Sequence, residues 1–185
     1  MATTTVAPKT KLTGGSFLLE DHNLETVFTP EDFNEDQQMI VKLADEFAVN
    51  ELLPAVEKIE HKEWQVTRDL LKKAADMGLT NADVPAEYGG SEMDKISSAI
   101  IADQMAKSGS FVVSMGAHAG IGTLPLVFFG TEEQKKKYLP RLASAEIIGS
   151  AARSRVGSVT SVRVAIGFVI TNTLSSGQGL GSRSL

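Results

Sequence analysis

Residues 34–47 read NEDQQMIVKLADEF, and this stretch decides the fold class. Its apolar side chains recur at spacings of three and four residues, at Met39, Ile40, Leu43, Ala44 and Phe47. That spacing places them on one face of an α-helix. Asn34 and Gln37 precede the stripe with the spacing of a capping box, so we expect the helix to begin there.

The flanking sequence continues the helical pattern in both directions. Upstream, Thr29 and Pro30 offer an N-cap hydroxyl and a proline suited to a first helical position. Downstream, Pro54 is expected to kink the helix or to start another, because proline lacks the N–H donor. A second apolar stripe then ends at Gly78, a natural C-cap, and consists of Val66, Leu70, Leu71, Ala74 and Met77.

The residues after Gly78 predict a turn followed by further helices. The composition of residues 84–90, VPAEYGG, indicates the turn. Helices are expected from about Asp94 to Lys107 and from about Ser110 to Gly120. The second of these is nearly uncharged, which predicts burial on most of its sides.

The last helical signals come before residue 146. A short apolar segment, 124–129, ends at Gly130. A capping box at Thr131 and Gln134 then opens a basic helix that should end before Pro140. Together these signals predict an all-α domain.

The chain changes character near Gly149. The full sequence of 185 residues carries a net charge of −5, but the residues after Glu146 contain four arginines and no acidic residue. Residues 162–170 alternate with the period of a β-strand between Ser/Gly-rich flanks. We therefore expect a partly disordered leader at 1–27, a helical domain at 28–149, and a non-native or disordered tail with weak β character at 150–185.

Composition excludes several classes of protein. The absence of cysteine excludes disulfides, thiolate nucleophiles and zinc–thiolate or iron–sulfur sites. The acidic balance argues against a nucleic-acid partner, whose phosphates require a basic face. No apolar run was expected to reach the ~20 residues of a transmembrane segment. The first eleven residues fit no targeting signal, which predicts a cytoplasmic location in a bacterium, or a mitochondrial one if the chain is eukaryotic.

Two pairs of residues at helical spacing suggest chemistry. Glu57 and His61 could share a metal, but no second pair of ligands is visible, which favours a surface ion pair. Ser114 and His118 could form a nucleophile–base pair. A third orienting group is missing, which favours polar groups that line a cavity or satisfy the backbone. No metal site and no catalytic residue is therefore assigned.

Four motifs in order resemble a known family: FTPEDF at 28–33, DVPAEYGG at 83–90, GAHAGIG at 116–122 and FGTEEQKKKYLPRLAS at 129–144. They are similar to the N-terminal helical domain of flavin-dependent acyl-CoA dehydrogenases. The leader GGSFL at 14–18 and the Gly-Ala-His segment are most similar to the very-long-chain-like branch. The resemblance covers roughly residues 14–149.

The resemblance implies a function. Members oxidise a fatty acyl-CoA between its α and β carbons and transfer a hydride to FAD. They pass electrons to an electron-transfer flavoprotein and are homo-oligomers. It also implies that the helix around residue 117 forms the floor of the acyl cavity, and the residues expected to line it are Val113, Ser114, Ala117 and Ile121.

The tail departs from the family pattern. A middle β-domain should begin after the Leu-Ala-Ser-x-Glu run, with an aromatic residue, a Thr-Glu pair and a closing Asp near the flavin. Residues 150–158 read SAARSRVGS and contain none of these. The domain that supplies the catalytic glutamate is also missing. We therefore expect an inactive fragment, with no cofactor-binding residue assigned; the alternative is a non-catalytic helical module that binds an acyl chain or a protein partner.

Overall fold

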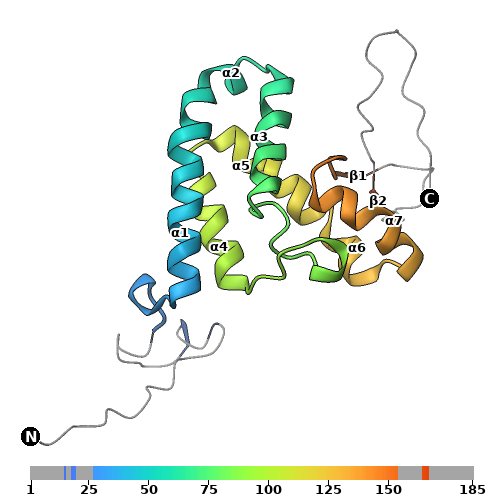
Figure 1. Cartoon of the computed structure of the whole chain (residues 1–185), viewed down its shortest axis with the longest axis horizontal. Helices are drawn as coiled ribbons and strands as arrows, with labels where there is room; N and C mark the ends of the chain where they lie inside the picture. Colours follow the sequence, from blue (N-terminus) through green and yellow to red (C-terminus); the bar gives the residue numbers. More distant parts are fainter. Residues whose placement is uncertain (1–14, 16–17, 20–26, 154–163, 167–185) are drawn as a thin grey trace, which may run out of the picture. The chain divides into compact units, whose positions relative to one another are not determined.

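The computed structural model describes residues 15, 18–19, 27–153 and 164–166 (Figure 1). The chain forms two compact units, residues 1–38 and 39–185. The helical content of the described residues confirms the predicted all-α class. The expected domain limits at residues 27 and 149 stay a prediction.

The described part of the first unit contains a short 3-10 helix, η3 (Pro30–Asp32), rather than the start of a long one. The Thr29 N–H donates to Asp32 Oδ2 over 2.9 Å. The capping box expected at the next helix is present. The Gln37 N–H donates to Asn34 Oδ1 over 2.8 Å, and the Asn34 N–H donates to Gln37 Oε1 over 3.2 Å.

The helical elements that follow cover most of the described chain. They are α1 (Glu35–Phe47), η4 (Ala48–Leu52), η5 (Leu53–Ala55), α2 (Val56–Glu60), α3 (Trp64–Asp76), η6 (Ala86–Tyr88), α4 (Lys95–Met105), α5 (Gly109–Gly116), η7 (Ala117–Ile121), α6 (Leu124–Phe129) and α7 (Glu132–Ala143). Two elements, η4 and η7, are single π-helical turns. Pro54 lies in the 3-10 turn η5, so the predicted change of helix at this proline is confirmed.

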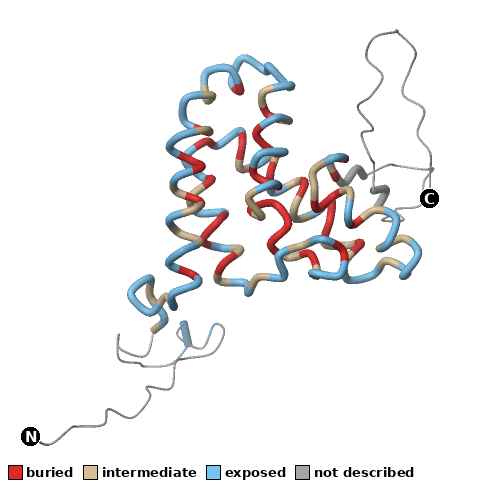
Figure 2. The backbone as a smooth tube through the Cα atoms, viewed as in Figure 1, coloured by how far each residue is buried: buried red, intermediate tan, exposed pale blue. Residues whose placement is uncertain are grey.

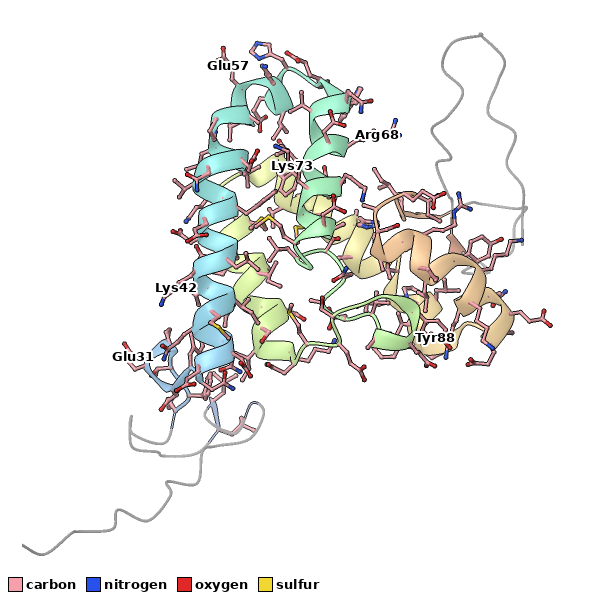
Figure 3. The ribbon with its side chains drawn as sticks, viewed as in Figure 1. Glu31, Lys42, Glu57, Arg68, Lys73 and Tyr88 are labelled. Carbon is pink, nitrogen blue, oxygen red and sulfur yellow. The ribbon has the colours of Figure 1, made fainter. Side chains whose placement is uncertain are left out.

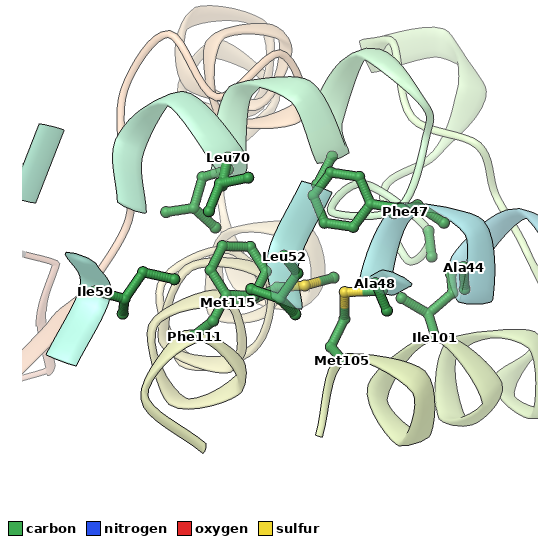
Figure 4. Close-up of a cluster of buried hydrophobic side chains, with 14 residues drawn as sticks. Ala44, Phe47, Ala48, Leu52, Ile59, Leu70, Ile101, Met105, Phe111 and Met115 are labelled. Atoms are coloured by element: carbon green, nitrogen blue, oxygen red, sulfur yellow. The ribbon is translucent and has the colours of Figure 1, made fainter. Parts of the chain in front are cut away.

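The larger hydrophobic core joins α1 to the helices around it (Figure 4). The side chains of Phe47 and Phe111 meet with their ring centroids 6.2 Å apart. Helix α5 contacts α2, α3 and α4, so it lies among the other helices of this core. Most of the predicted stripe on α1 packs here, but Met39 is exposed, because the buried face continues through Ala44 and Ala48 instead.

A second, smaller core contains residues of α7, and Figure 2 colours the buried residues red. It consists of Val84, Tyr88, Leu126, Leu139, Leu142, Ala143 and Ile147. These residues come from the loop before η6, from η6, α6 and α7, and from the segment after α7. The second core therefore attaches the predicted turn at residues 84–90 to the last helix of the domain.

Helix α7 corrects the prediction that Pro140 ends it, because it continues through Pro140 to Ala143. The missing N–H of Pro140 would have bonded the carbonyl of Lys136, and both residues are exposed, so water can satisfy that carbonyl. Leu139 and Leu142 are buried on either side of the proline. Their burial holds the helix together across the lost hydrogen bond.

Thr131 is the N-cap residue of α7, and the predicted capping box with Gln134 is present. The Gln134 N–H donates to Thr131 Oγ1 over 3.3 Å, and the Thr131 N–H donates to Gln134 Oε1 over 3.0 Å. Thr131→Ala is expected to lower the free energy of unfolding by about 1 kcal/mol, because an N–H at the helix end loses its partner. Urea unfolding followed by circular dichroism measures this loss. Thr131→Ser keeps the hydroxyl and should retain nearly the parent stability; equal losses in both variants would contradict the capping role.

The expectation that no apolar run is long enough to cross a membrane is corrected by residues 109–129. The helical run Gly109–Phe129 has 21 residues and a mean hydropathy of 1.6, enough by length and composition, with 33% of the window buried inside the protein. The run joins α5, η7 and α6, and Phe111, Met115 and His118 within it are buried. A core helix of this composition passes the same test, so the run is weak evidence for a membrane span.

The tail contains one short ladder among its described residues. Strand β1 (Ala151–Arg153) pairs antiparallel with β2 (Val164–Ile166), with Ala152 opposite Ala165. Strand β2 lies within the segment predicted to be a strand. Residues 154–163 and 167–185 lie outside the described residues. The remainder of the predicted strand, residues 162–163 and 167–170, is among them.

Candidate functional site

The helix expected to line a cavity is built from α5 and the π turn η7. Ser108 is the N-cap residue of helix α5, and its Oγ accepts the Phe111 N–H over 3.4 Å. Phe111 and Met115 face the larger core. The π turn then inserts an extra residue into the helical register, and His118 becomes buried within the turn.

The four predicted cavity residues lie on the less buried side of this helix. Val113 is 72% exposed and Ile121 is 56% exposed, while Ser114 and Ala117 are half-buried. The expectation that this segment is buried on most sides is therefore wrong for the described chain. Apolar side chains facing outward are available to contact a ligand or further protein, so the assignment of these four residues to an acyl cavity stays a prediction.

Ser114 and His118 do not form a nucleophile–base pair. Ser114 Oγ donates to the carbonyl of Ser110 over 3.0 Å. The His118 ring instead contacts the main chain, where its Nδ1 accepts the Gly149 N–H over 3.0 Å. Both side chains thus satisfy backbone groups, which is the interpretation that the sequence favoured.

Glu57 and His61 make neither a metal site nor the expected ion pair. The Nδ1 atom of His61 lies 2.7 Å from the main-chain carbonyl oxygen of Glu57, rather than near its carboxylate. The ring therefore satisfies a carbonyl at the end of α2. Within the described ranges, no group of three or more His, Asp or Glu residues could hold a metal ion.

The loop at residues 78–93 is held by two glycines with positive φ and by side-chain hydrogen bonds (Figure 3 labels its Tyr88). Gly78 and Gly89 adopt positive φ angles of 78° and 82°, which favour glycine. The Asn81 side chain joins two segments, since its Nδ2 donates to the Ala143 carbonyl over 3.2 Å and its Oδ1 accepts from Ser91 Oγ over 2.8 Å. These contacts tie the loop to the end of α7.

Tyr88 links the same loop to the beginning of α7. Its buried side chain donates a hydrogen bond from the hydroxyl to Glu132 Oε2 over 2.8 Å. This bond, with burial and the nearby negative charge, raises the pKa of Tyr88 to about 12. The same bond, with a second one from Lys135, lowers the pKa of Glu132. Glu132 also lies at the positive end of the α7 dipole. The pair is a structural connection between the turn and the helix.

Comparison with known proteins gives a family for this arrangement. Residues 34–146 match the family model described as "Acyl-CoA dehydrogenase, N-terminal domain". The chain belongs to the acyl-CoA dehydrogenase family. It is 50% identical over 145 residues to a "Probable acyl-CoA dehydrogenase" of Bacillus subtilis, an alignment that covers 78% of this chain and 24% of the relative.

Solved structures agree with this assignment. The crystal structure of an acyl-CoA dehydrogenase complexed with FAD from Bacillus anthracis matches with a TM-score of 0.70 and 50% identity, over 79% of this chain and 26% of that one. A chain in the structure of the electron transferring flavoprotein of Acidaminococcus fermentans matches with a TM-score of 0.58 and 33% identity, over 65% and 32%. This chain therefore spans about a quarter of the length of the 50%-identical Bacillus subtilis and Bacillus anthracis proteins. The very-long-chain-like branch stays a prediction.

Sequence reasoning missed three elements of this region. The link from Asn81 to Ala143, the pair of Tyr88 with Glu132 and the contact of His118 with Gly149 each join residues more than thirty positions apart. Spacing within a single helix carries no signal for such contacts. The polar character of Asn81 and His118 within apolar stretches is the one local sign that they have distant partners.

Proposed function

We propose that this chain is the helical N-terminal part of an FAD-dependent acyl-CoA dehydrogenase, an oxidoreductase that introduces a double bond between the α and β carbons of a fatty acyl-CoA. The observation that supports the proposal is the 50% identity to the FAD-complexed Bacillus anthracis enzyme over 79% of this chain. The family match at residues 34–146 covers the same helices.

In this reaction, the role of the chain is to provide apolar surface for the substrate. The apolar side chains of Val113 and Ile121 are exposed. The Ser114 hydroxyl donates its hydrogen bond to the Ser110 carbonyl within the same helix. The single titratable side chain of α5 and η7 is the buried His118. Such a surface favours an acyl chain over a polar group, because each buried methylene contributes about 0.8 kcal/mol.

No FAD-contacting residue is assigned among the described residues. The segment at which a flavin contact was expected, residues 150–158, includes Ala151–Arg153, whose main chain pairs with Val164–Ile166 in the β ladder. FAD, the catalytic carboxylate and the electron-transfer flavoprotein partner belong, in this proposal, to the rest of a longer protein. Assembly into a homo-oligomer and the cytoplasmic or mitochondrial location are part of the same proposal.

A chimera tests the function. Residues 34–146 replace the matching segment of the Bacillus subtilis relative, and acyl-CoA oxidation is measured with an artificial electron acceptor. The chimera is expected to be active, whereas the 185-residue chain alone is expected to be colourless and inactive. A folded, flavin-loaded chimera without activity would contradict the proposal. Acyl-chain binding by the isolated chain would instead favour a non-catalytic helical module.

Ala117 tests the position of the acyl chain in the same chimera. Ala117→Phe is expected to lower kcat/KM for long acyl chains by about tenfold relative to short ones, because the larger ring takes the space of several methylenes. The measurement is kcat/KM over a series of chain lengths. Ala102→Phe, at an exposed site on α4, is the matched control and should leave the profile unchanged. If Ala117→Phe leaves the dependence of kcat/KM on chain length unchanged, this helix does not form the floor of the acyl cavity.

A further inference from the structure

His118 joins three segments of the helical domain. The imidazole is 1% exposed, and its Nδ1 accepts the N–H of Gly149 over 3.0 Å. The His118 carbonyl accepts a hydrogen bond from Thr123 Oγ1 over 2.7 Å, which ties η7 to the start of α6. One buried residue thus connects the π turn, the start of α6 and the segment after α7.

These contacts define one form of the ring. Because Nδ1 accepts a hydrogen bond, a neutral imidazole carries its proton on Nε2. A doubly protonated ring would direct an N–H at the N–H of Gly149. The contact with Gly149 therefore requires the neutral ring in a single tautomer.

Two glycines bring the same segments into backbone contact. A Cβ added to Gly122, just after η7, would lie 2.4 Å from the carbonyl carbon of Gly149. A Cβ added to Gly149 would lie 3.0 Å from the carbonyl carbon of Gly122. Since no side chain separates these two stretches, Gly149 is held at a fixed place beside the π turn.

Gly149 stands where the helical part of the chain ends. It follows the last residue of the smaller core, Ile147, by two positions, and strand β1 starts two positions later at Ala151. We propose that His118 is a positioning residue that, together with the Gly122–Gly149 contact, fixes the point and direction in which the chain leaves the helical domain. The inference is independent of the proposed function, because it concerns this chain and no ligand.

A direct measurement on the parent chain tests the contact. In a ¹⁵N-labelled sample, a scalar coupling between the Gly149 amide nitrogen and His118 Nδ1 is expected across the hydrogen bond. Absence of this coupling at neutral pH, with both resonances assigned, would overturn the proposal. The measurement needs no variant, so it decides the question even if substitutions at position 118 prevent folding.

Two substitutions separate the two ring nitrogens. His118→Asn places a carbonyl oxygen near the position of Nδ1 and can still accept the Gly149 N–H, whereas His118→Gln places its amide near Nε2. Amide exchange at Gly149 is expected to be about tenfold faster in His118→Gln than in the parent, and little changed in His118→Asn. The Leu139 amide in α7 reports on the helix. Equal acceleration at both amides in both variants would indicate a general core role and overturn the inference.

The direction of exit is measured with spin labels, since the chain contains no native cysteine. Labels at Glu60→Cys in α2 and Arg153→Cys in β1 should give a narrow distance distribution in the parent and in His118→Asn. A broader distribution is expected in His118→Gln and in Gly122→Ala. Gly116→Ala, where an added Cβ meets nothing within 4 Å, is the matched control. Equal widths in all five proteins would overturn the proposal.

Discussion

Acidification from pH 6.5 to pH 4 is expected to lower the free energy of unfolding by about 3 kcal/mol through His118 alone. Burial lowers the pKa of this imidazole from 6.5 to about 4, against a smaller opposite effect of the hydrogen bond to the Leu142 backbone. The cost of charging a buried ring without a countercharge is the physical cause.

The direction of the effect follows from proton binding. Between pH 6.5 and pH 4 the unfolded chain binds a proton at His118 that the folded chain does not bind, so stability rises with pH across this interval. The stabilisation is complete above pH 6.5 and is lost as the pH falls toward 4. Each pKa unit corresponds to about 1.4 kcal/mol.

Variants isolate the contribution of His118 from that of the carboxylates. Urea unfolding is measured at several pH values for the parent, His118→Asn and His61→Gln. The slope of the unfolding free energy against pH reports the number of protons taken up on unfolding. In this interval, that number should be smaller by about one in His118→Asn than in the parent. His61 is exposed, and its replacement should leave the slope unchanged. An unchanged slope in His118→Asn would show that the ring is protonated in the folded chain.

The sequence predicted most helices because the signals for them are local. The stripe ending at Met77, the glycine at position 78 and the capping box at Thr131 all act within one or two turns of helix. Pro140 was misjudged for the opposite reason. Its cost is local, but it is outweighed by the burial of Leu139 and Leu142 against distant residues.

The predictions about the candidate site were less accurate than those about the helices. The nearly uncharged helix expected from about Ser110 to Gly120 was predicted to be buried on most sides, yet Val113 within it and Ile121 just after it are exposed. A helix that is apolar all round predicts a partner on every side, and the periodicity does not say whether each partner lies within the chain. The role of His118 depends on Gly149, 31 residues away, which no spacing rule connects to it. The family assignment came from motifs instead, and the comparisons confirm it.

Gly90→Ala is expected to lower the free energy of unfolding by about 3 kcal/mol. A Cβ at this position would lie 1.9 Å from the Val84 carbonyl oxygen and 2.5 Å from the Val84 Cβ. The Val84 carbonyl cannot move freely, because it accepts the Glu92 N–H over 3.1 Å and Val84 is buried in the smaller core. The backbone angle φ of Gly90 is not positive, so the loss comes from the steric clash rather than from the backbone conformation.

The neighbouring glycine is the matched control for this clash. Gly89 has a φ of 82°, but a Cβ added there meets nothing within 4 Å. Gly89→Ala should therefore cost about 1 kcal/mol, the strain of a left-handed alanine. Urea unfolding followed by circular dichroism compares the two variants under identical conditions. Because Val84 and Tyr88 attach this loop to α7, Gly90→Ala should also weaken the packing of that helix, with faster amide exchange at Leu139 than in Gly89→Ala. Similar losses in the two variants would show that the loop shifts at residue 84 to admit a methyl group, and that the close approach of Gly90 does not hold the loop in place.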